Sequence, residues 1–258
     1  MILTLRGSRA QGSGRPHARF SVWLPGSTLG RELLVAGSRP RALVIKVLFP
    51  LLMTVPLVAA RAPRFWAAAL LTVMVAMIGT VGSAVAVARA RQSGLLTRLA
   101  LTPRPAWRIL GGWVLAGTLV DALQILPVLT LASAGGGRIE GLPLLALAAT
   151  ACLLTAAVVG CVVAACGGGL GEVLLDVTVV LAPLLYLGGL FTGVPRSGWR
   201  FGAALVDPFG QLDSAFLNAL GAGGAFGVET IGLVSLVVIV TALAALGLLS
   251  RWILERGG

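Results

Sequence analysis

The sequence predicts an all-α integral membrane protein in which six transmembrane helices form one bundle. Apolar residues make up 57% of the 258-residue chain and charged residues only 11%, about half the charged fraction usual in soluble domains. The mean hydropathy is +0.98. Apolar stretches of about 20 residues, the length that an α-helix needs to cross a bilayer, recur along the chain. A multi-pass helical protein accounts for all three observations.

The chain is strongly basic, with 20 basic residues, 19 of them arginine, against nine acids and a net charge of +11. In a soluble protein this balance would suggest nucleic-acid binding, but basic loops also orient membrane helices. We therefore expect a lipid bilayer as partner and no nucleic acid. Cys152, Cys161 and Cys166 share one apolar stretch without a nearby histidine, which favours buried thiols over a metal or redox site. No catalytic constellation is evident, so we expect no enzyme activity.

Residues 1–25 are expected to be a cytosolic tail, and residues 26–258 the membrane domain. The tail lacks the apolar core of a cleavable signal peptide. In the stretch STLGRELLVAG that follows it, Ser27 or Thr28 can cap a short helix that Gly37 ends. The leucines of this helix share one face, as expected of an amphipathic helix lying in the membrane interface.

Six transmembrane spans are expected after the amphipathic helix. Short or polar connections separate them, and their approximate bounds are 42–60, 65–88, 109–133, 142–166, 172–192 and 229–251. If the N-terminus is cytosolic, fifteen of the twenty basic residues fall on the cytosolic side. This excess predicts a multi-pass protein of the plasma (inner) membrane with both termini in the cytosol.

The cytosolic segment 89–108, between the second and third spans, combines arginines with a half-apolar helical pattern. Its leucines share one side of a helical wheel and two arginines share a neighbouring face: Leu95, Leu96, Leu99, Arg91 and Arg98. Pro103 and Pro105 stop the helix. Periodicity alone leaves two interpretations open, a basic loop on anionic lipid headgroups or a helix that docks into a groove of a cytosolic partner.

Polar residues inside the predicted spans are few. Asp121 lies near the middle of the third span, where it could hydrogen-bond Gln124, face a polar transport path or be protonated. Glu172 and Asp176 open the fifth span on one face, and Lys46 lies in the cytosolic part of the first. An ion pair among these three residues, within one chain or across a dimer, is the favoured interpretation, and a proton relay is the alternative.

The sequence GLLTRLALTPRPAWRILGGWVLAG resembles the cytosolic loop and third span of ABC-2 type exporter permeases, especially the daunorubicin-type drug-export branch. The residues that carry this resemblance are Gly94, Leu95, Leu96, Leu99, Thr102, Pro103, Ile109, Leu110 and Gly111. Gln92 or Ser93 stands where the family often has glutamate, which removes a charged contact there but leaves the apolar face intact.

A second stretch, LAPLLYLGGLFTGVPRSGWRFGAALVDPFGQLDSAF, resembles the family's fifth span, its external re-entrant segment and the proline motif that follows. The matching residues are Pro183, Gly188, Gly189, Pro195, Asp207, Pro208 and Phe209. The resemblance covers about residues 26–252.

The resemblance implies a permease that dimerises, with a second copy or a related chain, and docks a cytosolic ATPase subunit through a coupling helix. The coupling residues it implies are Arg91, Gly94, Leu95, Leu96, Arg98, Leu99, Thr102 and Pro103. The chain itself has no phosphate-binding loop, since the glycine run 167–171 lacks the required lysine and hydroxyl residue. ATP and Mg²⁺ are therefore expected in the partner subunit, and a hydrophobic or amphipathic small molecule is the expected cargo. Lipid or glycan export, and a proton-coupled carrier using Asp121, Glu172 and Asp176, are the alternatives.

Overall fold

The computed structural model describes residues 40–101, 105–195 and 197–257, and in these ranges the chain forms helices and no strands. The expected cytosolic tail and amphipathic helix lie outside the described residues. The helices are α2 (Pro40–Ala59), α3 (Arg64–Gln92), α4 (Leu95–Ala100), α5 (Ala106–Gly135), η1 (Ile139–Gly141), α6 (Leu142–Cys166), α7 (Leu170–Leu187), α8 (Trp199–Val206), α9 (Pro208–Ala219) and α10 (Val228–Gly257).

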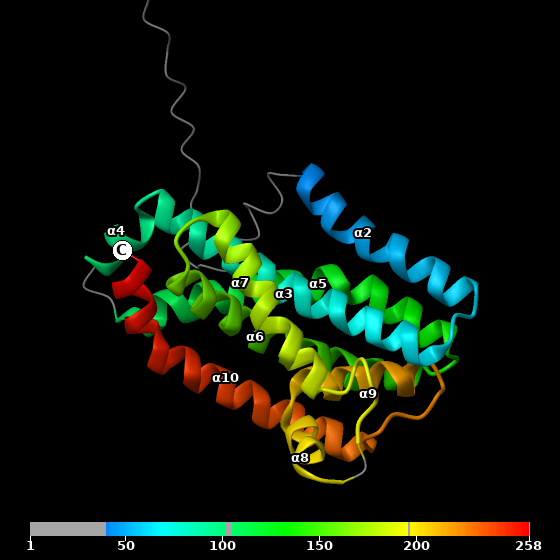
Figure 1. The fold of residues 1–258 in the computed structure, drawn as a ribbon. Coiled ribbons are helices and arrows are strands. Elements are labelled where there is room, and N and C mark those ends of the chain that lie inside the picture. Colours follow the sequence, from blue (N-terminus) through cyan, green and yellow to red (C-terminus); the bar gives the residue numbers. More distant parts are fainter. Residues whose placement is uncertain (1–39, 102–104, 196, 258) are drawn as a thin grey trace, which may run out of the picture.

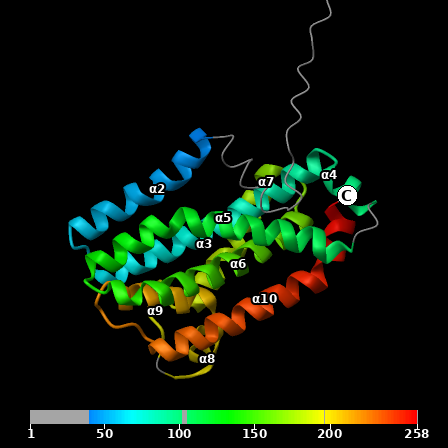
Figure 2. The same cartoon turned by 180° about the vertical axis from the view of Figure 1, so that it is seen from behind.

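The long helices lie side by side in a bundle with two distinct ends (Figures 1 and 2). Helix α4 and the C-terminus lie at one end, while the α2–α3 turn, η1, α8 and α9 lie at the other. We call these the α4 end and the α9 end.

Helix α6 lies at the centre of the bundle and packs against α3, α5, α9 and α10. It is apolar on all sides and rich in alanine, which is typical of a helix enclosed by others. Small residues let α3 approach it closely: a Cβ on Gly79 would lie 2.8 Å from the Cβ of Ala156. The core around α6 divides along the bundle axis into one apolar cluster towards α9 and another towards α4.

Among the residues that the structure describes, five helices are long and apolar enough to cross a membrane: α3, α5, η1 with α6, α7 and α10. The all-helical class is therefore confirmed, and five of the six predicted spans have a matching helix. The described apolar part of α2, Val44–Ala59, is shorter than these five, so the first span stays a prediction. Helix α6 has the bounds 142–166 that the sequence predicts.

Helix α7 ends at Leu187 rather than near residue 192. Gly188 caps it, and Gly189 follows with a φ of +87°, a left-handed conformation that favours glycine. A Cβ on Gly188 would lie 2.9 Å from the backbone nitrogen of Gly210. The chain therefore turns early because the end of α7 meets the start of α9 backbone to backbone.

Candidate functional site

Helix α4 follows α3 after a sharp turn at the α4 end of the bundle. Ser93 caps α3, and Gly94 adopts a φ of +66°, which lets the chain turn sharply within two residues. The six-residue helix packs against the last part of α10 and the end of α3. Leu96 is completely buried in the cluster that contains Ile253 and Leu254 of α10.

This packing corrects the predicted docking face. Leu95 is 38% exposed and Leu101 83% exposed, and Arg98 is also exposed. Leu96, however, points into the bundle and cannot enter a partner's groove in this conformation, because α10 continues far enough to cover that side of α4. Leu99 is half-buried, and Thr102 and Pro103 lie outside the described residues.

Arg91 also departs from its predicted position on an outward face beside Arg98. Its side chain is half-buried, and its Nη1 donates a hydrogen bond of 2.5 Å to the carbonyl oxygen of Gly167, in the turn between α6 and α7. The two arginines therefore do not share one face: Arg91 binds another part of the same chain, and Arg98 is directed outward.

Lys46 and Asp121 form an ion pair between α2 and α5, with 3.3 Å between Lys46 Nζ and Asp121 Oδ1. Both residues lie about 20 Å from the α9 end at 1.5 Å per residue, since Lys46 precedes Ala59 by thirteen residues and Asp121 precedes Gly135 by fourteen. The Asp121 side chain is 14% exposed and that of Lys46 53%. In the described part of the chain Asp121 therefore binds Lys46 rather than Gln124, which is buried.

The expected pairing of Lys46 with Glu172 or Asp176 within one chain is wrong. Both acids lie in the first two turns of α7, towards the α4 end, whereas Lys46 lies level with the middle of α5. Glu172 instead accepts hydrogen bonds from the backbone N–H groups of Gly168 and Gly169, at 3.1 and 3.4 Å. These groups precede α7, so the carboxylate stabilises the start of that helix. Pairing across a dimer stays a prediction.

The motif Asp207-Pro208-Phe209 begins α9. Asp207 is the N-cap and its Oδ1 accepts a 3.1 Å hydrogen bond from the backbone N–H of Phe209, Pro208 occupies the first turn, and Phe209 is 1% exposed in the core. Burial raises the pKa of Asp207 to about 7, against the lowering effect of that hydrogen bond. Pro195 is half-buried in the connection between α7 and α8. The structure thus gives this motif a capping and packing role.

Two arginines for which the sequence predicts no site role, Arg64 and Arg138, bind the chain at the C-terminal end of α9. Arg64 donates a 2.9 Å hydrogen bond to the carbonyl oxygen of Gly221, and Arg138 one of 3.5 Å to that of Asn218. The last carbonyl groups of a helix lack partners within it and favour a nearby cation. The sequence did hold one indication of this role. Both arginines lie just outside predicted spans, which places them at an end of the bundle, near the segments that connect the helices.

Helix α9 also contains polar residues that the sequence analysis did not single out. Gln211 and Asp213 are 1% and 4% exposed. Gln211 donates a 2.7 Å hydrogen bond to the carbonyl oxygen of Leu205, whereas Asp213 Oδ1 is buried without a hydrogen-bond partner among the described residues. Burial raises the pKa of Asp213 to about 7. Gln211 Oε1 and Ser214 Oγ of this helix are likewise buried without a hydrogen-bond partner among the described residues.

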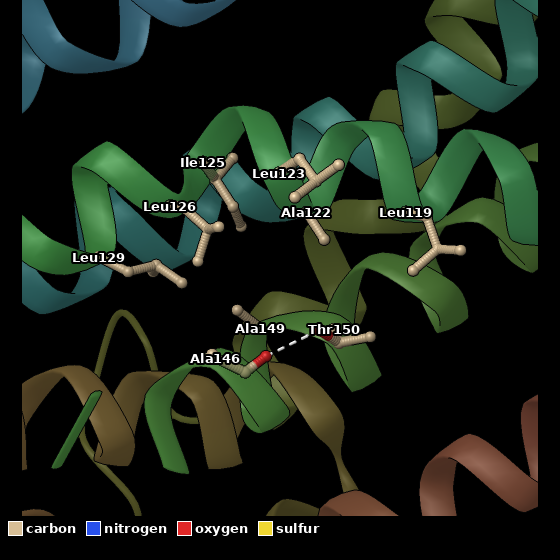
Figure 3. Close-up of a pocket in the computed structure, with 9 residues that line it drawn as sticks. All are labelled: Leu119, Ala122, Leu123, Ile125, Leu126, Leu129, Ala146, Ala149 and Thr150. Carbon is tan, nitrogen blue, oxygen red and sulfur yellow. Dashed lines mark hydrogen bonds between the residues drawn. The ribbon is translucent and has the colours of Figure 1, made fainter. Parts of the chain in front are cut away.

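An apolar pocket of about 100 Å³ lies between α5 and α6 (Figure 3). Its lining is Leu119, Ala122, Leu123, Ile125, Leu126, Leu129, Ala146, Ala149 and Thr150. The Thr150 hydroxyl donates to the carbonyl oxygen of Ala146 in its own helix, at 2.8 Å. The pocket is smaller than the roughly 300 Å³ typical of ligand sites, and Asp121 is not among its lining residues, so it makes a poor substrate site.

Among the described residues no group of three or more His, Cys, Asp or Glu side chains could hold a metal ion. The fold and the five apolar helices define a multi-pass α-helical membrane protein. No family model, curated protein or solved structure matches the chain.

Proposed function

We propose that the chain is the membrane-spanning subunit of an ATP-driven ABC-2 type exporter. In this proposal α2 completes six spans, both termini lie in the cytosol, and α8 with α9 form the external re-entrant segment. A second permease and cytosolic ATPase subunits complete the transporter, and ATP and Mg²⁺ bind in the ATPase. The cargo is a hydrophobic or amphipathic small molecule, because the long helices offer apolar walls with few fixed charges.

The observation that carries the proposal is the position of α4. A six-residue helix directly follows a long apolar helix, turns sharply at Gly94 and lies at one end of the bundle beside the C-terminus. It presents Leu95, Arg98 and Leu101 outward while Leu96 anchors it to α10. An exposed helix anchored on its inner side can bind a cytosolic partner and pass on that partner's movement.

The positions of the acids weaken the proton-coupled alternative. A relay through Asp121, Glu172 and Asp176 requires these carboxyl groups to approach one another. Asp121 instead pairs with Lys46 of α2, while Glu172 binds the backbone ahead of α7. Within the described chain, Asp121 therefore lies near the middle of α5, apart from Glu172 and Asp176 at the start of α7.

A pair of leucine substitutions tests the docking role of α4. Leu95→Asp places a charge on the exposed side of α4, so we expect at least a tenfold loss of the co-purifying ATPase chain with an unchanged melting temperature. Ile139→Asp is the matched control, because Ile139 is 64% exposed at the α9 end, and it should retain the ATPase. Leu96→Asp should instead destabilise the protein, since it buries an unpaired charge. An ATPase that stays bound to the Leu95→Asp protein would contradict the docking role.

A further inference from the structure

The hydrogen bond from Arg91 to Gly167 joins two segments that are far apart in the sequence. Arg91 lies in the last turn of α3, and Gly167 is the C-cap of α6. Carbonyl groups at a helix C-terminus have no partner inside the helix, so a guanidinium there forms a charge-assisted bond. The bond therefore ties the end of α3 to the turn that leads into α7.

The turn at 167–169 is itself attached to the start of α7. Glu172 binds the N–H groups of Gly168 and Gly169. Gly167 lies so close to α7 that a Cβ there would be 2.6 Å from Val173 Cγ2 and 3.4 Å from Asp176 Oδ2. These contacts hold residues 167–169 against the first two turns of α7. A displacement of the Gly167 carbonyl group should therefore also displace the start of α7.

On its other side, Arg91 lies next to α4. Only Ser93 and Gly94 separate the end of α3 from Leu95, and α4 packs directly on α3. A displacement of α4 therefore reaches Arg91 across three residues, Gln92, Ser93 and Gly94. The half-buried guanidinium points to the α6–α7 turn and not to the outward face of α4, which separates its role from docking.

We propose that Arg91 is a positioning residue that transmits movement of α4 to the N-terminal end of α7 through its hydrogen bond to Gly167. This inference rests on the proposed function, in which an ATPase subunit moves α4. It adds a polar connection from the end of α3, next to α4, to the turn before α7, beside the apolar connection from α4 to α10 through Leu96. Arg89 provides a matched control, since it is exposed in the same turn of α3.

Hydrogen exchange of the complex with its co-purifying ATPase tests the inference without knowledge of the cargo. In the wild type, the non-hydrolysable nucleotide AMP-PNP with Mg²⁺ should change amide exchange in both α4 and residues 170–176. In Arg91→Ala we expect the change in α4 to persist and that in residues 170–176 to fall at least fivefold. Arg91→Lys, which keeps a cationic donor, should restore part of it, and Arg89→Ala should behave as the wild type.

An Arg91→Ala protein that keeps the full response of residues 170–176 would overturn the inference, as would one that loses the ATPase. If Arg91→Ala does not accumulate, Arg91→Gln, which removes the charge, replaces it with the same expected results. A wild-type chain that binds no ATPase would refute the proposed function instead. The Arg91 contact is then tested in the isolated chain, where Arg91→Ala should speed exchange at residues 168–172 by about tenfold, the effect of losing a hydrogen bond to a charged group. Unchanged exchange there would refute the contact itself.

Discussion

Asp213 is a buried acid at the α9 end of the bundle. It is 4% exposed in α9, and its Oδ1 has no hydrogen-bond partner among the described residues. Burial raises the pKa of Asp213 to about 7, because a low-dielectric environment disfavours the charged carboxylate. In the folded protein this carboxyl group therefore holds its proton at pH values where an unfolded chain would have released it.

This difference in proton binding predicts that Asp213 destabilises the fold as the pH rises. Below about pH 4 both states are protonated, and from there to about pH 7 the folded state loses about 1.4 kcal/mol per pH unit relative to the unfolded state. Above pH 7 the loss stays constant. Asp213→Asn removes this effect, so the melting temperature of the purified protein should differ less between pH 5 and pH 8 than in the wild type.

Glu140→Gln is the control for that measurement, because Glu140 is an exposed acid at the same end of the bundle. It should keep the wild-type difference. Asp207, whose pKa is also raised to about 7, contributes in the same direction, so Asp213→Asn should remove part of the difference and not all of it. An unaltered difference in Asp213→Asn would contradict the explanation.

At the scale of helices, the crossing of α3 and α6 depends on glycine. A Cβ on Gly160 of α6 would overlap the Thr80 carbonyl oxygen and Ser83 Oγ of α3, and Gly79 lies against Ala156 in the same contact. The obstructing oxygen at Thr80 belongs to the backbone, so a rotamer change cannot make room. The two helices must move apart if either glycine gains a side chain.

Gly160→Ala should therefore destabilise the protein by about 1–3 kcal/mol or more, the usual effect of overpacking. The melting temperature or the yield of monodisperse protein measures this loss. Gly117→Ala is the matched control, since a Cβ at Gly117 of α5 meets nothing within 4 Å. That substitution should be neutral or stabilising by up to about 1 kcal/mol, because alanine favours a helix over glycine. Equal effects of the two substitutions would contradict the close α3–α6 contact.

At the scale of the whole molecule, the arginines are distributed unevenly between the two ends of the bundle. The described arginines near the α4 end are Arg89, Arg91, Arg98, Arg108, Arg251 and Arg256. Those near the α9 end are Arg61, Arg64, Arg138 and Arg200. Arg64 and Arg138 bind carbonyl groups at the C-terminal end of α9, and Arg200 lies over the Tyr186 ring, 4.5 Å from its centroid. An excess of basic residues at the α4 end supports a cytosolic orientation for that end.

Chemical labelling of Cys166 can test this orientation. It is exposed at the end of α6 towards α4, whereas Cys152 and Cys161 are buried. A membrane-impermeant maleimide should therefore label the wild type only after the cells are permeabilised, and Cys166→Ser should abolish the label. Ile139→Cys in the Cys166→Ser background should be labelled in intact cells. Labelling of Cys166 in intact cells would reverse the proposed topology.

The composition and the periodic apolar stretches were sufficient to predict the helical membrane class and the main helices. The bounds of α6 were predictable because an uninterrupted apolar stretch ends in glycines at 167–169. The early end of α7 was not, because it depends on the contact between Gly188 and Gly210, which are distant in sequence. A short α4 was expected from its leucines and prolines, but the burial of Leu96 depends on α10.

Local sequence thus determined which segments become apolar helices, since helix length and hydropathy are properties of neighbouring residues. The tertiary structure decided which polar residues meet. It paired Lys46 with Asp121 and not with Glu172, and it turned Arg91 towards Gly167. Sequence spacing places a side chain on a face of its own helix and at a depth along it. The neighbour that this face meets is set by how the helices pack around α6, which involves the whole chain at once.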